Sequence, residues 1–175
     1  MRGGRAELDL DLRVLSGRLP TDAFGHAFMV CPLPWGGGVP FFNGDAMVYR
    51  VDFGHGRTGA QLRTRILKTA DYRADVASVG TDDAFENNGI VRMSSSLGVR
   101  NFANTALVPI GERLLATYDV GRPWEIDPVS LDAITTVGYQ SEYRAGVPLP
   151  GPFPLLMGSA HPYHDAHTGE FFSVN

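Results

Sequence analysis

Residues 159–170 of this chain read SAHPYHDAHTGE, and the apolar run FFSV and a final Asn175 follow them. Asp165, Thr168 and Gly169 are typical of a hairpin turn, so the stretch predicts two short strands joined by that turn. The first strand is expected just before His161 and the second over residues 170–174. Pro162 excludes a helix interior at this point. The end of the chain is therefore expected to be a β-hairpin.

The same stretch holds three of the five histidines, and neutral imidazole is a common ligand of transition metals. In a strand, His161 and His164 would point to opposite faces, so His161, His164 and His167 could converge only around a tight turn. We therefore expect His161 to be one ligand of a metal site that distant parts of the fold complete. A self-contained three-histidine zinc site is the alternative.

Glycine and proline punctuate the whole chain, with 21 and 12 residues, which favours short strands joined by turns over long helices. The sequence predicts a mostly β protein built from stacked hairpins or propeller blades. Turn signals occur at residues 52–56, 109–112 and 125–128, and the prolines of 148–154 indicate a stiff connection. Strands are expected at residues 46–53, 59–67, 91–94, 105–110, 113–118, 134–138, just before 161, and 170–174.

Composition limits the function classes. With 175 residues, 43% hydrophobic content and a mean hydropathy of -0.08, the chain suits one soluble domain with a real core. The net charge of -4 comes without a basic stripe, so no nucleic acid partner is expected. No run approaches the roughly 18 apolar residues of a transmembrane segment, although peripheral membrane contact through an apolar loop stays open. The single Cys31, expected to be a small buried hydrophobe, suits a reducing, cytoplasmic location.

Four segments, in this order, resemble the N-terminal part of the carotenoid cleavage oxygenase family. They are residues 17–28 (GRLPTDAFGHAF), 41–53 (FFNGDAMVYRVDF), 97–106 with 113–131 (LGVRNFANTA and RLLATYDVGRPWEIDPVSL), and 160–170. The last segment is similar to the family motif A-H-P-x-x-D-x-x-T-G-E around its first iron-ligating histidine. Members of this family are non-haem Fe(II) dioxygenases that cleave double bonds in carotenoids, apocarotenoids and stilbenes.

The resemblance implies a seven-bladed β-propeller in which four histidines from different blades hold Fe(II) on the axis, beneath a lid that forms an apolar substrate tunnel. The motif gives the ligand role to His161 alone, and it implies that His164 and His167 are exposed turn residues. His26 and His55 are expected in a strand entry and a turn. The substrate would be an apolar polyene or stilbene that reacts with dioxygen to give two carbonyl compounds.

Two positions depart from the family pattern. Asp119 stands where the family has a Glu that hydrogen-bonds an iron-ligating imidazole, and its shorter side chain needs a backbone shift or a water bridge for that role. The alternative for Asp119 is a carboxylate that accepts a backbone N–H at a strand end. Ala46 stands where the family has Gly, and Ala tolerates a positive φ poorly. Glu125 and Asp127 are expected to be turn residues.

The fold class implied is all-β, a partial β-propeller of two to three blades. Residues 1–175 are then the N-terminal portion of a single propeller domain, truncated at its C-terminal side. With one of four ligands present, the isolated chain is expected to be inactive. One competing hypothesis is a non-catalytic β-propeller binding or scaffold protein. A weaker one is a small zinc hydrolase that uses the terminal histidines.

Overall fold

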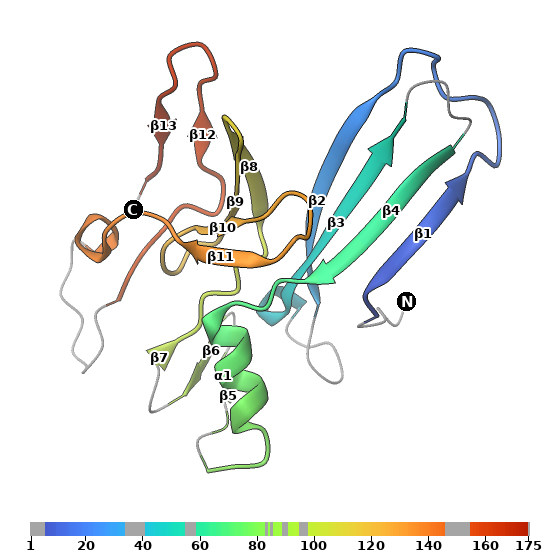
Figure 1. Ribbon diagram of the computed structural model, residues 1–175. Helices are drawn as coiled ribbons and strands as arrows, with labels where there is room; N and C mark the ends of the chain where they lie inside the picture. Colours follow the sequence, from blue (N-terminus) through green and yellow to red (C-terminus); the bar gives the residue numbers. More distant parts are fainter. Residues whose placement is uncertain are drawn as a thin grey trace.

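Two four-stranded antiparallel sheets dominate the computed structural model (Figure 1), which describes residues 6–33, 41–54, 59–82, 84, 86–88, 91–94, 98–145 and 155–174. The first sheet has the strand order β1-β4-β3-β2 and the second β11-β10-β9-β8. Smaller units are a three-stranded sheet of β5, β6 and β7 and the hairpin β12–β13. The elements are β1 (Leu8–Arg13), β2 (Gly25–Leu33), η1 (Phe41–Asn43), β3 (Asp45–Phe53), β4 (Gly59–Ile66), α1 (Ala70–Ser78), β5 (Glu86–Asn88), β6 (Val91–Ser94), β7 (Gly98–Val99), β8 (Ala106–Ile110), β9 (Arg113–Thr117), β10 (Trp124–Ile126), β11 (Ala133–Thr136), η2 (Gln140–Tyr143), β12 (Tyr163–His164) and β13 (Phe171–Phe172).

The strands predicted around β3, β4, β6, β8, β9, β11 and β13 are confirmed to within a few residues at their ends. The predicted Asp127 turn is also confirmed, because its Oδ1 accepts the N–H groups of Val129 and Ser130 at 2.7 and 2.8 Å. The prediction that Glu125 is a turn residue is wrong, because Glu125 lies in β10 and pairs with Arg113 of β9 at 2.6 Å. Strands β1, β5, β7, β10 and β12 and the helix α1 were not predicted, and of β2 only the entry at His26 was expected.

The structure differs from the expectations for the segment before His161, for Cys31 and for Ala46. The prediction of a strand just before His161 is wrong, because residues 155–160 form only isolated bridges and β12 begins after His161. Cys31 is exposed and not buried, since β2 is the edge strand of its sheet. Ala46 is buried in β3 without a positive φ, so the missing Gly causes no strain there. His55 and the prolines of 148–154 lie outside the described residues.

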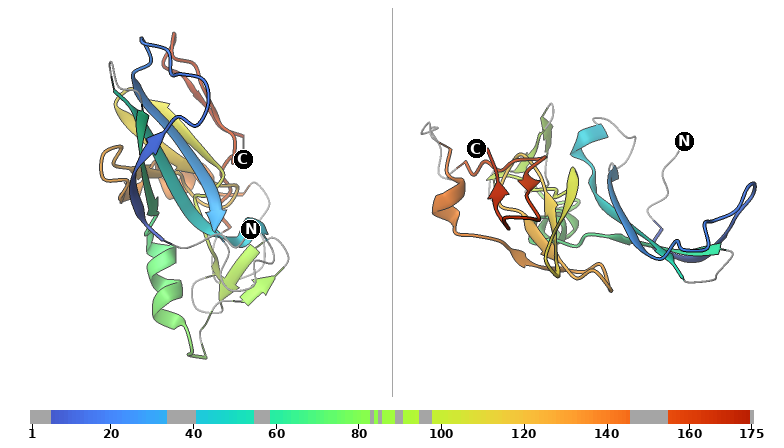
Figure 2. Two further views of the ribbon diagram at one scale, coloured as in Figure 1. Left: turned by 90° about the vertical axis from the view of Figure 1, so that its right-hand side faces the viewer. Right: turned by 90° about the horizontal axis from the view of Figure 1, so that it is seen from above.

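The hydrophobic core lies between the two four-stranded sheets. Ala46 and Val48 of β3 pack against the inner face of the second sheet, which contributes Leu114, Ala116 and Ile126, all less than 5% exposed. Seen from above, the sheets diverge away from this shared core (Figure 2). The core therefore joins the two sheets at one end only and leaves the far end of the first sheet uncovered.

A buried ionic cluster ties α1 to both β3 and the small sheet. Asp75 of α1 accepts from Arg92 at 3.0 Å and from Arg100 at 2.6 Å, and Arg92 also donates to Asp45 at 3.0 Å. All four side chains are at most 3% exposed. The Arg92 guanidinium also lies 4.7 Å from the centre of the Phe102 ring. Buried charges of this kind are tolerated only when they are paired, so the cluster fixes how α1 docks.

The apolar face of β1 is only partly covered by the described residues. Leu8, Leu10 and Leu12 alternate with Asp and Arg along the strand and remain 38%, 48% and 38% exposed. Leu10 lies opposite Leu62 of β4 in the register, so the apolar row continues onto the next strand. Exposed apolar faces on edge strands favour association.

We therefore expect the 175-residue chain to self-associate or aggregate, and Leu10→Glu to reduce that association. Light scattering at matched concentrations measures the change. Asp11→Lys, on the opposite face of the same strand, is the matched control and should leave association unchanged. A monodisperse wild-type monomer would contradict this account of the face.

Candidate functional site

A hairpin lies at the end of the chain, as predicted, but its first strand is β12, which follows His161 instead of ending at it. Its turn is held by Asp165. β12 and β13 pair with Tyr163 opposite Phe172 and His164 opposite Phe171. The Asp165 carboxylate accepts the N–H of His167 at 2.8 Å, and its carbonyl accepts the N–H of Gly169 at 2.8 Å. Gly169 has φ +74, a conformation that glycine adopts without strain. The hairpin lies beside β8 (Figure 1).

The structure separates the three terminal histidines. His161 lies two residues before β12 and is exposed, His164 is half-buried in β12, and His167 is exposed in the turn. Across the part of the chain that the structure describes, no group of three or more His, Cys, Asp or Glu side chains could hold a metal ion. The geometry therefore does not support the local three-histidine zinc site or the zinc hydrolase built on it.

Strand β9 and its continuation hold the residue that precedes His161. The Asp119 Oδ1 atom accepts the Ala160 N–H at 3.0 Å, and the Thr117 hydroxyl donates to the Ala160 carbonyl at 2.6 Å. Asp119 is exposed, whereas Thr117 is fully buried. The structure thus brings Asp119 and the backbone beside His161 together, and it gives Asp119 the strand-end hydrogen bond that was the alternative expectation.

Burial also shifts the pKa of Tyr118, the residue between Thr117 and Asp119. Desolvation raises the pKa of Tyr118 to about 12, with the charge of Asp119 adding to the shift and Arg92 opposing it. The Tyr118 ring packs edge-on against Phe102 at 5.2 Å. Tyr118 therefore stays protonated at neutral pH and serves as a packing residue beside the site.

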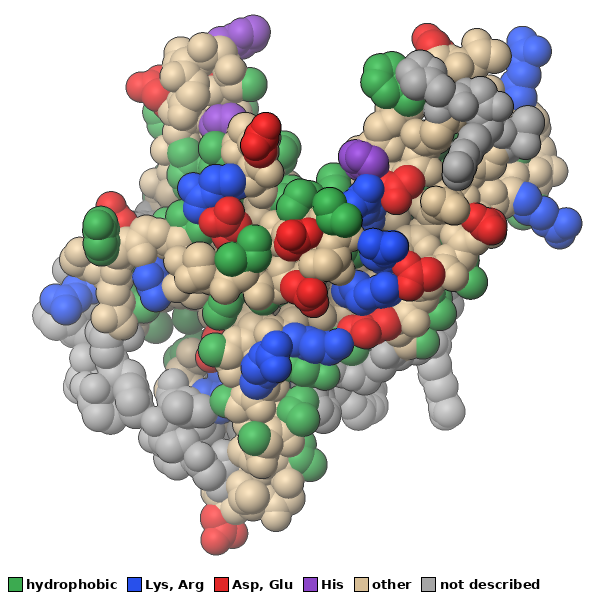
Figure 3. Space-filling model, viewed as in Figure 1, with side chains coloured by type: hydrophobic (Ala, Val, Ile, Leu, Met, Phe, Trp, Pro, Cys, Tyr) green, Lys and Arg blue, Asp and Glu red, His purple; other side chains and the backbone are tan. Residues whose placement is uncertain are grey.

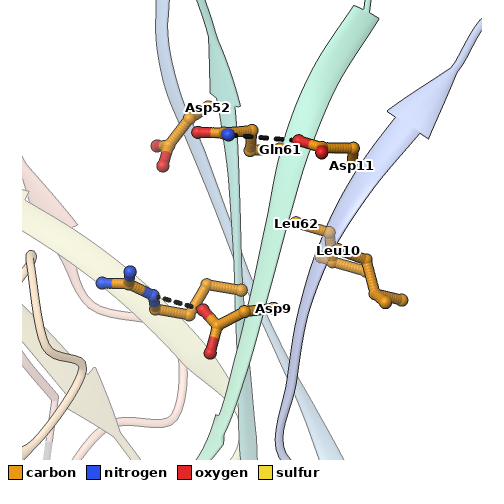
Figure 4. A pocket seen from close by; sticks show the side chains of 7 residues that line it. Asp9, Leu10, Asp11, Asp52, Gln61 and Leu62 are labelled. Atoms are coloured by element: carbon orange, nitrogen blue, oxygen red, sulfur yellow. Dashed lines mark hydrogen bonds and ion pairs between the residues drawn. The ribbon is translucent and has the colours of Figure 1, made fainter.

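Charged side chains gather on the face of the first sheet that also carries Ala46 and Val48 and looks toward the second sheet (Figure 3). Arg50 and Arg63 of this face donate to the Pro128 and Val129 carbonyls at 2.6 and 2.7 Å. A hollow there is lined by Asp9, Asp11, Asp52, Gln61 and Arg63 together with two leucines (Figure 4). Its groups satisfy one another: Asp9 pairs with Arg63 and Arg65 at 2.8 and 2.6 Å, and hydrogen bonds from Arg65 and then Arg63 lower the pKa of Asp9. His26 lies on the same sheet in β2, as expected, and its Nδ1 is 2.6 Å from Asp52 Oδ1. We assign this hollow a structural role.

Thr117 is a site residue that the sequence reasoning missed. It follows the apolar residues 114–116 at the end of β9, and a hydroxyl buried in such a strand requires a hydrogen-bond partner. Gly158 is a second one, because a Cβ there would lie 2.5 Å from the Gly121 carbonyl oxygen and 2.8 Å from that of Tyr118. That close backbone crossing is invisible without the fold.

No helix in the described part of the chain is long and apolar enough to cross a membrane.

Comparison with known proteins places these features in a family. The model of the retinal pigment epithelial membrane protein (RPE65) family matches residues 2–175. Resveratrol cleavage oxygenase 1 of Aspergillus fumigatus is 28% identical over 97% of this chain and 32% of its own length. The crystal structure of Pseudomonas brassicacearum lignostilbene dioxygenase matches with a TM-score of 0.72 at 25% identity, over 97% of this chain and 34% of that one. Cobalt-substituted Synechocystis ACO matches with a TM-score of 0.64 at 23% identity, over 92% of this chain and 33% of that one.

The chain thus spans about a third of the length of these relatives. Together with the two four-stranded sheets, the matches confirm the all-β, partial β-propeller fold. The resemblance drawn from the four sequence segments is likewise confirmed. This chain belongs to the RPE65, or carotenoid cleavage oxygenase, family.

Proposed function

We propose that this chain is the N-terminal portion, as residues 1–175 of a single propeller domain, of a non-haem Fe(II) dioxygenase. The proposed reaction is the oxidative cleavage of a C=C bond in an apolar stilbene, apocarotenoid or carotenoid. One C=C bond and the O=O bond break, and two C=O bonds form, so that R-CH=CH-R′ and O2 give R-CHO and R′-CHO. The lone Cys31 supports a reducing, cytoplasmic location.

The observation that carries the proposal is the presentation of His161. Its imidazole is exposed, and within the described ranges it takes part in no hydrogen bond or ion pair. The backbone on its N-terminal side is nevertheless fixed by β9. An unengaged imidazole on a fixed backbone suits a metal ligand, since ligand affinity depends on preorganisation.

The described residues supply one of the four ligands of the proposed iron site. His161 would contribute a neutral imidazole, a ligand that suits iron, and the remaining ligands would come from other blades. When bound, Fe(II) would activate dioxygen for its reaction with the alkene. Asp119 is the candidate carboxylate behind the site, because one of its oxygens already holds the Ala160 N–H beside the ligand.

Among possible substrates, we favour a stilbene. Two relatives at 25% identity or more carry resveratrol cleavage and lignostilbene dioxygenase in their names. Stilbenes and apocarotenoids share an apolar conjugated alkene, so one apolar tunnel could admit both.

The test uses the full-length polypeptide, by which we mean a protein that carries this sequence at the length of its relatives. It is loaded with Fe(II) and incubated with resveratrol, and separately with an apocarotenal, under oxygen. We expect two aldehydes by mass spectrometry and one O2 consumed for each alkene cleaved, with resveratrol the better substrate. Iron binding without cleavage of either compound would favour the non-catalytic binding or scaffold protein instead.

A further inference from the structure

Both backbone polar groups of Ala160 form hydrogen bonds with side chains that lie two positions apart in β9 and its continuation. The Thr117 hydroxyl donates to the Ala160 carbonyl at 2.6 Å, and Asp119 Oδ1 accepts the Ala160 N–H at 3.0 Å. That carbonyl belongs to the peptide bond that enters His161. The Thr117 bond therefore holds the peptide plane that enters His161, and the Asp119 bond holds the peptide plane before it, so the two together fix the backbone on both sides of the Ala160 Cα.

The surroundings strengthen the two hydrogen bonds to Ala160. Thr117 is 0% exposed and Ala160 is 7% exposed, so the hydroxyl–carbonyl bond lies in a dry, low-dielectric environment where hydrogen bonds are stronger. The Asp119 bond is charge-assisted, which also strengthens it.

The chain on the N-terminal side of Ala160 has no room to shift. The Gly158 N–H donates to the Asp119 carbonyl at 2.9 Å, and the Gly121 N–H donates to the Leu156 carbonyl at 2.8 Å. Gly158 itself lies so close to the Gly121 and Tyr118 carbonyls that an added Cβ would clash. Residues 156–160 are thus packed against residues 118–121, and this packed segment ends at Ala160, the residue before His161.

We infer that Thr117 and Asp119 are positioning residues for His161, acting through the Ala160 backbone and not through the imidazole. This inference rests on the proposed function, in which His161 binds the metal. The name "Ala160 clamp" is used below for the Thr117 and Asp119 hydrogen bonds to Ala160.

Two pairs of variants test the Ala160 clamp in the full-length polypeptide. Thr117→Val removes the hydroxyl at nearly constant shape, whereas Thr117→Ser restores it. Asp119→Ala removes the acceptor, whereas Asp119→Asn keeps an oxygen that can accept the Ala160 N–H. Thr135→Val, which removes an exposed hydroxyl from β11, is the matched control.

Cobalt(II) is the probe, because its visible absorption bands report coordination geometry independently of activity. We expect Thr117→Val and Asp119→Ala to weaken Co(II) binding by about 10- to 100-fold, the usual range for partners that orient a ligand, and to alter the spectrum. Thr117→Ser and Thr135→Val should keep the wild-type spectrum. Asp119→Asn, which keeps an acceptor oxygen but loses the charge, should lie closer to the wild type than to Asp119→Ala. Asp119 is exposed, so its pair decides the outcome even where Thr117→Val does not fold.

Two outcomes overturn different statements. If His161→Ala abolishes Co(II) binding while Asp119→Ala and Thr117→Val bind as the wild type does, the Ala160 clamp has no positioning role and the proposed function stands. If the wild type binds no Co(II), or His161→Ala binds it as the wild type does, the proposed function itself fails.

Discussion

Replacing His161 with alanine is expected to remove most of the bound iron, and nearly all oxygenase activity, from the full-length polypeptide. The loss of a metal ligand leaves an incomplete coordination sphere, so the drop in affinity should exceed the roughly 100-fold upper range seen for outer partners. His164→Ala and His167→Ala are matched controls from the same hairpin and should change little. Metal analysis and oxygen uptake with resveratrol measure both effects.

Equal losses in all three variants would return the metal to the local histidine cluster. The structure argues against that outcome, because the three side chains do not converge. The 175-residue chain alone should bind Fe(II) no better than its His161→Ala variant, since one anchored imidazole does not make a four-ligand site.

Replacing Asp75 with asparagine is expected to cost about 3–5 kcal/mol of the free energy of unfolding, the usual effect of removing one partner from a buried ion pair. Asp75 is 1% exposed and faces Arg92 and Arg100, both 0% exposed. Asparagine keeps the shape and removes the charge that compensates two buried guanidiniums. Urea unfolding of the full-length polypeptide, compared at a common m-value, measures the loss.

Asp9 offers a matched control, because it also bridges two arginines but lies on the surface. Its partners are Arg63 and Arg65, and more than half of its side chain is exposed. Surface ion pairs contribute little, so Asp9→Asn should leave the urea midpoint nearly unchanged. Equal effects at Asp75 and Asp9 would mean that burial does not set the strength of the Asp75 cluster.

Much of the sheet structure could be predicted from the sequence, because turn residues and alternating side chains are local signals. The hairpin at 163–172 followed from Asp165 and Gly169, and β9 from its apolar run. The helix α1 was missed because its apolar residues form no stripe. Its start depends on the Thr69 side chain, which accepts the Tyr72 N–H at 3.1 Å, and its docking depends on buried Asp75. Such pairing with distant arginines carries no local signal.

The candidate site divides in the same way. The motif around His161 indicated the proposed ligand, and a carboxylate at position 119 could be flagged by resemblance. The hydrogen bonds that Ala160 forms with Thr117 and Asp119 join residues more than 40 positions apart, so only the fold reveals them. Local turn chemistry is readable from the sequence, whereas contacts between segments far apart in the sequence are not.

Anomalous diffraction at the iron edge from crystals of the Fe(II)-loaded full-length polypeptide tests the central claim most directly. We expect one strong peak within bonding distance of a His161 ring nitrogen, with His164 and His167 turned elsewhere and the other ligands drawn from later blades. A peak held by His164 or His167, or an iron site that His161 does not touch, would contradict it.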